Sequence, residues 1–152
     1  MATPKLRREQ VAGMNIHYVN YSLDYFLDAQ QRIGFKSIEL WCAAPHVWLD
    51  HMRYYDAKEI RRKIESRGLA VHVLTPENCT YPYQFAAKEP EHIERSFGYF
   101  SNGIRLANEL GCDYMETPAG AIGTKTRRKR GSAARPCCAA WPTWRRKTAS
   151  PW

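Results

Sequence analysis

Acidic side chains are missing from one end of this 152-residue sequence. Residues 119–152 hold 9 of the 23 Lys and Arg residues and none of the 15 Asp and Glu residues. The first 118 residues hold the other 14 basic residues and every acid, so their formal charge is −1. The last 34 residues therefore carry a formal charge of +9, which accounts for the basic character of the whole chain, whose net charge is +8. The formal charge of −1 on residues 1–118 argues against nucleic-acid or anionic-membrane partners, which basic proteins bind, for this part of the chain.

Several other signals are absent. No apolar run approaches the ~18–20 residues that span a bilayer, which excludes an integral membrane protein. The basic N-terminus is not followed by an apolar stretch, so we expect no secretory signal. The five cysteines form no CxxC pair, which excludes a zinc ribbon or a thioredoxin-type motif. We expect reduced thiols and a cytoplasmic location.

Short catalytic and phosphate-binding motifs are also absent. The sequence contains neither GxGxxG nor GxxxxGK[ST] after a predicted strand, and neither GxSxG nor HExxH. The first absence weakens the case for a nucleotide-binding sheet. The others leave no sign of a nucleophile elbow or of a zinc-protease helix.

What is present is an alternation of helical and strand patterns. Helices are predicted over 23–33, 56–67 and 90–110, and Gly34, Gly68 and Gly111 end them because glycine readily adopts positive φ. A buried strand is predicted after each glycine, and another over 14–19. The order βαβαβαβ predicts an α/β fold with parallel strands. A doubly wound sheet and part of a (β/α) barrel both fit, and composition does not separate them.

Ligands of parallel α/β folds bind at the carboxyl ends of strands. The predicted loops 42–55 and 76–89 are long for such folds and carry aromatic, His and Glu side chains, which suit a polyhydroxy ligand. The candidate substrate-binding residues at these ends are His17, Glu39, Trp41, His46, Glu77 and Tyr81. Structural roles compete: Glu39 could pair with a cation on a neighbouring strand, Glu77 could cap a turn, and Trp41 could serve in packing.

Residues 119–152 show neither a helical nor a strand period, and we expect them to be disordered. One interpretation is an arm that binds nucleic acid or an anionic surface, with KTRRKR at 125–130 and Trp141, Trp144 and Trp152 for stacking. The interpretation we favour is an out-of-frame translation of coding sequence, because every acid disappears abruptly after a strand end. Under it, a nucleic-acid partner is not expected.

Two segments resemble a known family. SLDYFLDAQQRIGFKSIELW with the following PHVW resembles the xylose isomerase-like sugar isomerase/epimerase family. VHVLTPENCTYPYQFAAKEPEHIERSFGYFSNGIRLANELGCDYM resembles its fructoselysine 3-epimerase-like branch. The resemblance covers roughly residues 11–118. It implies a (β/α)8 TIM barrel of which this chain holds the first four units, so we expect a truncated barrel between an extension at 1–10 and the segment 119–152.

The resemblance also implies a chemistry. Family members interconvert sugars with a divalent metal (Mn, Mg or Co) and two Glu residues that act as acid and base. Carried over by position, Glu39, Trp41, His46, Glu77 and Tyr81 would line the sugar pocket. The family's metal ligands and catalytic Glu residues belong mainly to strands five to eight, so no catalytic or metal-binding residue is assigned here. We expect the chain to be inactive alone, without bound metal, and able to self-associate through exposed strand edges.

Overall fold

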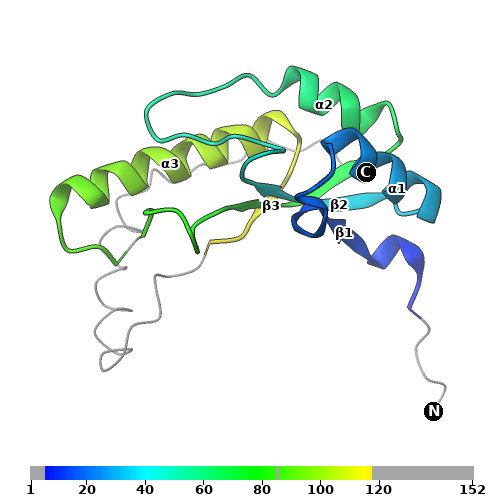
Figure 1. Ribbon diagram of the computed structural model, residues 1–152, viewed down its shortest axis with the longest axis horizontal. Coiled ribbons are helices and arrows are strands. Elements are labelled where there is room, and N and C mark those ends of the chain that lie inside the picture. The colour runs from blue at the N-terminus through cyan, green and yellow to red at the C-terminus, as the bar shows by residue number, and fades with distance from the viewer. Residues whose placement is uncertain (1–5, 85, 118–152) are drawn as a thin grey trace, which may run out of the picture.

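The computed structural model describes residues 6–84 and 86–117, and these form one parallel sheet covered by helices (Figure 1). The strands are β1 Ala12–Met14, β2 Ser37–Cys42, β3 Ala70–Pro76 and β4 Tyr114–Met115. The helices are α1 Leu23–Ile33, α2 Lys58–Glu65 and α3 Pro90–Glu109, with short 3-10 turns η1 Arg8–Gln10 and η2 Asn15–Tyr18. The prediction for 119–152 falls outside the described residues.

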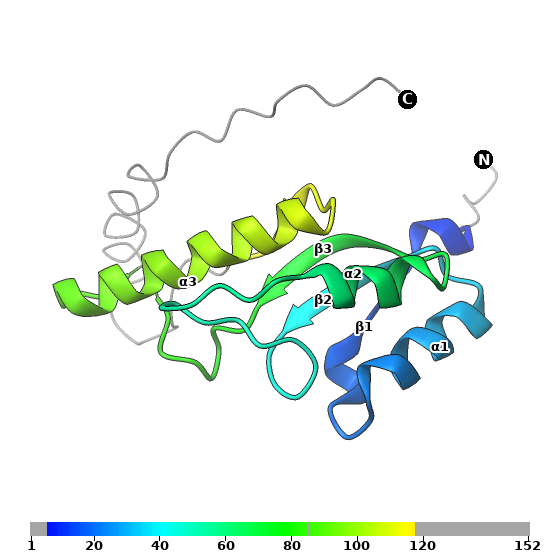
Figure 2. The same cartoon turned by 90° about the horizontal axis from the view of Figure 1, so that it is seen from above.

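The strand order decides between the two architectures that the sequence left open. The strands lie side by side in chain order β1-β2-β3-β4, all parallel. Figures 1 and 2 show α1, α2 and α3 together on one side of this sheet. A doubly wound sheet reverses its strand order and carries helices on both faces, whereas a (β/α) barrel does neither. The described residues therefore form consecutive units of a barrel-type fold.

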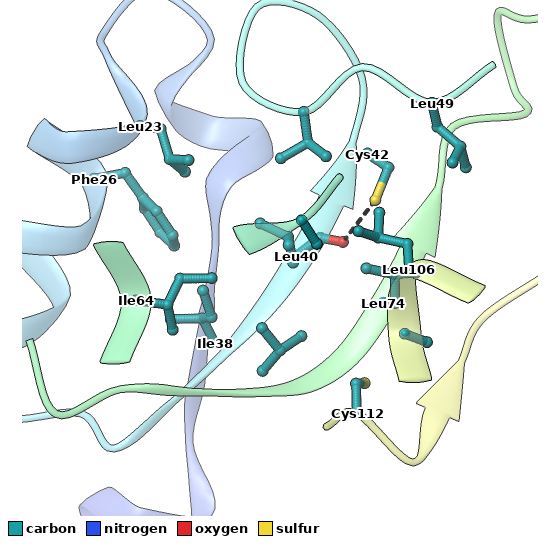
Figure 3. Close-up of a cluster of buried hydrophobic side chains, with 14 of the residues drawn as sticks. Leu23, Phe26, Ile38, Leu40, Cys42, Leu49, Ile64, Leu74, Leu106 and Cys112 are labelled. Carbon is teal, nitrogen blue, oxygen red and sulfur yellow. Dashed lines mark hydrogen bonds between the residues drawn. The ribbon is translucent and has the colours of Figure 1, made fainter. Parts of the chain in front are cut away.

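The core lies between the sheet and its helices. Side chains alternate along β2, so Ile38, Leu40 and Cys42 face the helices and are fully buried, while Glu39 and Trp41 lie on the opposite face and are half-buried. Figure 3 shows apolar side chains from all three helices meeting this row: Leu23 and Phe26 of α1, Ile64 of α2 and Leu106 of α3. We call the other side of the sheet the open face, because no described helix covers it.

Local signals place the helix ends largely as predicted. Ser22 caps α1 by accepting a hydrogen bond from the backbone N–H of Tyr25 (3.1 Å). Gly34, Gly68 and Gly111 have φ of 87°, 66° and 68°, a region that other residues rarely enter. Asp56 accepts from the N–H of Lys58 at 2.7 Å, where α2 begins.

One strand prediction is wrong. A strand was expected over 14–19, but β1 ends at Met14 and the chain turns into η2. The reason is a side chain: the amide of Asn15 bonds to the backbone of Trp41, so the neighbouring strand needs no further partner from β1. His17, expected near the end of a strand, therefore lies in a 3-10 turn.

Charged side chains join α1 to α2. Lys63 of α2 donates to Asp24 of α1 at 2.7 Å, and Arg67 donates to both Asp24 (3.1 Å) and Asp28 (2.5 Å). The hydrogen bond from Lys63 is the main reason that the pKa of Asp24 is lowered.

Among the described residues, no helix is both long enough and apolar enough to cross a membrane.

The long segment between β2 and α2 rests on α3 at a glycine. A Cβ atom on Gly98 would lie 2.7 Å from the backbone oxygen of His51, which is closer than real contacts allow. Next to it, the side-chain amide of Asn102 donates to the backbone oxygen of Asp50 at 2.8 Å. The missing side chain of Gly98 therefore allows this loop to pack directly against the backbone of α3.

We predict that Gly98→Ala lowers the free energy of unfolding. In an exposed helix the same change would raise it by about 1 kcal/mol, because alanine is the better helix former. Here the added methyl must push the backbone of residues 50–52 away from α3. Urea denaturation measures the difference, with Ser101→Ala on the same helix as a control that adds no atom. A more stable Gly98→Ala variant would contradict the packing described.

Candidate functional site

Three loops meet at the carboxyl edge of the sheet: residues 15–22 after β1, 43–57 after β2 and 77–89 after β3. Parallel strands bring these loops to the same edge, which is where α/β folds bind their ligands. Side chains from the strand ends connect the loops in series.

The first connection is made by Asn15, directly after β1. Its side-chain oxygen accepts from the backbone N–H of Trp41 at 2.7 Å, and its side-chain nitrogen donates to the backbone oxygen of Trp41 at 3.0 Å. The amide thus pairs with both polar groups of one β2 residue, as the backbone of a neighbouring strand would. Asn15 is fully buried, and the hydrogen bond from Trp41 N–H gives its side-chain oxygen the partner that a buried polar atom requires.

The same amide holds His46. Asn15 Nδ2 lies 3.0 Å from His46 Nδ1, and His46 Nε2 lies 2.8 Å from the backbone oxygen of Tyr21. His46 therefore bridges the loop after β2 to the loop after β1. Both of its ring nitrogens are engaged within the protein.

The second connection runs from Trp41 to Glu77, which lies just beyond β3. The Trp41 indole N–H donates to Glu77 Oε2 at 2.7 Å. The other carboxylate oxygen accepts from the backbone N–H groups of Cys79 (2.6 Å) and Thr80 (2.8 Å) and from the Thr80 hydroxyl (3.1 Å). Burial opposes ionisation of Glu77, but these donors outweigh it and lower the pKa of the carboxyl group. Glu77 is an ionised carboxylate that holds the turn after β3.

Glu39 differs from Glu77 in its surroundings. It lies in the middle of β2 on the open face, where Oε1 accepts from the Thr75 hydroxyl of β3 at 2.7 Å. Among the described residues this is the one hydrogen bond that Glu39 makes, and no Lys or Arg of these residues forms an ion pair with it. The neighbouring-strand partner is a hydroxyl and not the cation considered from the sequence.

Tyr81 and Trp48 extend the edge outward. The backbone N–H of Ala44 donates to the Tyr81 hydroxyl at 3.4 Å, which joins the second loop to the third. The rings of Tyr81 and Trp48 lie 6.0 Å apart at 55°, and Trp48 is 52% exposed. Deeper in the protein, His51 Nδ1 lies 3.0 Å from the hydroxyl of Tyr83, whose ring stacks on Tyr99 at 3.8 Å. The loops thus carry aromatic side chains and are held to one another by hydrogen bonds at the edge of the sheet.

Comparisons with known proteins agree with this architecture. A family model described as xylose isomerase-like TIM barrel matches residues 27–148 of the 152. The chain belongs to the xylose isomerase-like TIM barrel family. The matched region extends past residue 118, where the resemblance noted from the sequence ends, into residues outside the described part.

Relatives and solved structures of the family add detail. Fructoselysine 3-epimerase of Shigella flexneri is 28% identical over 102 residues, which are 66% of this chain and 36% of that protein. The Escherichia coli O157:H7 enzyme of the same name is 26% identical over the same shares. A xylose isomerase domain-containing protein from Salmonella typhimurium aligns with a TM-score of 0.60 at 17% identity, over 87% of this chain and 44% of that chain. A sugar phosphate isomerase/epimerase from Parabacteroides distasonis aligns with a TM-score of 0.58 at 9% identity, over 89% and 46%. The chain thus spans about a third of the curated relatives and just under half of these structures.

The six predicted site residues fall into two groups. Five lie at the carboxyl edge or on the open face: Trp41, His46, Glu77 and Tyr81 in the connections between the loops, and Glu39 in β2 with its hydrogen bond to Thr75. His17 is exposed on η2 and lies outside these connections. Their role in substrate binding stays a prediction. Two important residues were missed, Asn15 and Thr75, since an amide or a hydroxyl at a strand end carries no motif; the polar residue directly after a short apolar run was the available signal for Asn15.

The described residues do not offer a metal site. Within 6–84 and 86–117 no group of three or more His, Cys, Asp or Glu side chains lies close enough together to hold a metal ion. Glu77 uses both carboxylate oxygens for internal hydrogen bonds, and His46 uses both ring nitrogens. The donor set that a divalent metal requires is therefore not formed by this part of the chain.

We predict that Glu77→Gln removes part of the acid sensitivity of the fold. Because the pKa of Glu77 is lowered on folding, its contribution to stability is present above the ordinary value near 4.5 and is lost as the pH falls through the lower folded value. The variant should lose about 1–3 kcal/mol of unfolding free energy at neutral pH. It should also show a shallower fall of stability in acid than the unaltered protein.

Urea denaturation at neutral pH and at successive acidic pH values gives both quantities. Glu94→Gln on the exposed surface of α3 is the matched control. A control is needed because Asp24, Asp50 and Glu89 also have lowered pKa values and give every variant an acid dependence of its own. Equal acid dependence of Glu77→Gln and Glu94→Gln would show that the Glu77 carboxylate does not anchor the turn.

Proposed function

We propose that this chain supplies the first part of the substrate pocket of a sugar isomerase/epimerase, and that its ligand is a small sugar or sugar derivative. Family membership supports the reaction class. The carboxylate of Glu39 supports the position of the pocket, because it lies on the open face beside the connected loops. That carboxylate is the observation on which the proposal mainly rests.

The chemistry around Glu39 suits a polyhydroxy ligand. A carboxylate has about four acceptor sites, and Thr75 uses one of them on Oε1. The remaining sites can accept hydrogen bonds from neighbouring sugar hydroxyls, which are charge-assisted and hence strong. Trp41 lies two residues along the same face of β2, half-buried, where its ring can pack against the C–H groups of a sugar. Charge and aromatic surface together favour a sugar over an apolar ligand.

Proton transfer in such a reaction needs an acid and a base that we do not assign to residues 6–84 and 86–117. We propose that a divalent metal and the acid and base of the reaction depend on residues outside 6–84 and 86–117, because these residues form no three-ligand cluster. The chain spans 36% of fructoselysine 3-epimerase from Shigella flexneri. We accordingly expect sugar binding by the 152-residue chain without turnover.

Two further expectations stay predictions. A cytoplasmic location agrees with Cys42, Cys79 and Cys112, which are all free thiols. Self-association through the outer edges of β1 and β4 agrees with their position at the two sides of the sheet.

We predict that Glu39→Gln weakens binding of fructoselysine to the chain about tenfold or more. A hydrogen bond to a charged group contributes about 1.5–3 kcal/mol, and about 1.4 kcal/mol corresponds to a factor of ten in affinity. Thr75→Val should weaken binding less, because it releases the carboxylate without removing it. Isothermal titration calorimetry with fructoselysine and with fructose measures these effects.

Glu65→Gln is the matched control, since Glu65 is an exposed carboxylate on α2. Unaltered affinity in Glu39→Gln would remove Glu39 from the pocket, and absence of any sugar binding by the unaltered chain would overturn the proposed function. Epimerisation of fructoselysine in the presence of Mn²⁺ would show that the chain needs no further groups.

A further inference from the structure

The orientation of the Asn15 amide is fixed by its neighbours. The oxygen and nitrogen of an Asn side chain are told apart by their hydrogen-bond partners. Here one amide atom faces the Trp41 N–H, which only donates, and the other faces the Trp41 carbonyl, which only accepts. The atom at 2.7 Å from the N–H must therefore be the oxygen, and the amide nitrogen must face both Trp41 O and His46.

The fixed amide in turn determines where His46 carries its proton. Asn15 Nδ2 has two hydrogens: one bonds to Trp41 O, which leaves the other for His46 Nδ1, 3.0 Å from the amide nitrogen. A proton on Nδ1 would set two donors against each other, so Nδ1 is bare and accepts. At the opposite side of the ring, Nε2 lies 2.8 Å from the carbonyl oxygen of Tyr21, which only accepts, so Nε2 carries the proton. Two independent neighbours require the same tautomer.

We propose that Asn15 is a positioning residue which locks His46 as a neutral imidazole with its proton on Nε2, and so ties the loop 15–22 to the loop 43–57. One amide then has two tasks: it extends the β1–β2 pairing and it sets the state of the histidine. His46 has no ring nitrogen left for a substrate proton, so it does not act as an acid or base. The place of this device at a sugar pocket rests on the proposed function, whereas the tautomer does not.

The unaltered 152-residue chain, labelled with ¹⁵N, provides the main test. Long-range ¹H–¹⁵N correlation spectra in mildly alkaline buffer distinguish bare from protonated ring nitrogens, and His46→Gln assigns the signals. We expect His46 Nδ1 at the shift of a bare nitrogen and Nε2 at that of a protonated one, without the averaging that exposed His17 should show. An averaged His46 ring, or a protonated Nδ1, would overturn the proposal.

Asn15→Asp gives the complementary test. The carboxylate has nearly the shape of the amide, but its second oxygen only accepts, so His46 Nδ1 should become protonated in this variant. Asn20→Asp, an exposed position in the same loop, is the matched control and should leave the ring signals unchanged. If Asn15→Asp folds, as judged by circular dichroism, and Nδ1 stays bare, the proposal fails; if it does not fold, the tautomer of the unaltered chain decides.

Titration with fructoselysine separates the two proposals. A locked His46 ring without sugar binding leaves the inference intact and overturns only the proposed function. Sugar binding with an averaged His46 ring overturns the inference about the tautomer and leaves the proposed function intact.

Discussion

The carboxyl edge of this sheet depends on one side chain that acts as a piece of strand. β1 has only three residues, and without further pairing the backbone N–H and C=O of Trp41 would lack partners. Unpaired backbone groups in a buried position are costly. The Asn15 amide supplies both partners from one residue, so the chain can leave the sheet at once and enter η2. The short first strand and the position of the first loop both follow.

From that point the loops are coupled in order. His46 bonds the second loop to the first, and the indole of Trp41 bonds β2 to the Glu77 carboxylate at the start of the third loop. Tyr99 of α3 then donates to the backbone oxygen of Glu77 at 2.8 Å, so the helix layer also fixes this turn. Buried polar networks of this kind hold a geometry only when every member is paired. Most of the polar side chains at this edge are thus engaged in building it.

Periodicity and glycine position were enough to predict most of the fold. The helices after Ser22 and at Pro90 and the three helix-ending glycines follow from backbone rules that act within a few residues. Strand order was not predictable in this way, because both candidate architectures share the pattern βαβαβαβ. The end of β1 was missed for a related reason: the competing partner of Trp41 is a side chain 26 residues away in the sequence, and no local pattern reveals such a contact.

The two glutamates at the site show the limit of sequence reasoning most clearly. Glu39 lies in the middle of β2 and Glu77 just beyond the end of β3, and residue type made both of them candidates for ligand binding. Their partners separate them: Glu77 receives four hydrogen bonds from the protein, while the described partner of Glu39 is the single hydroxyl of Thr75. A carboxylate whose acceptor sites are filled holds structure, and one with sites remaining on an uncovered face can bind hydroxyl groups. Because the difference arises from a turn, an indole and a neighbouring strand that fold together, only the assembled edge of the sheet assigns the two roles.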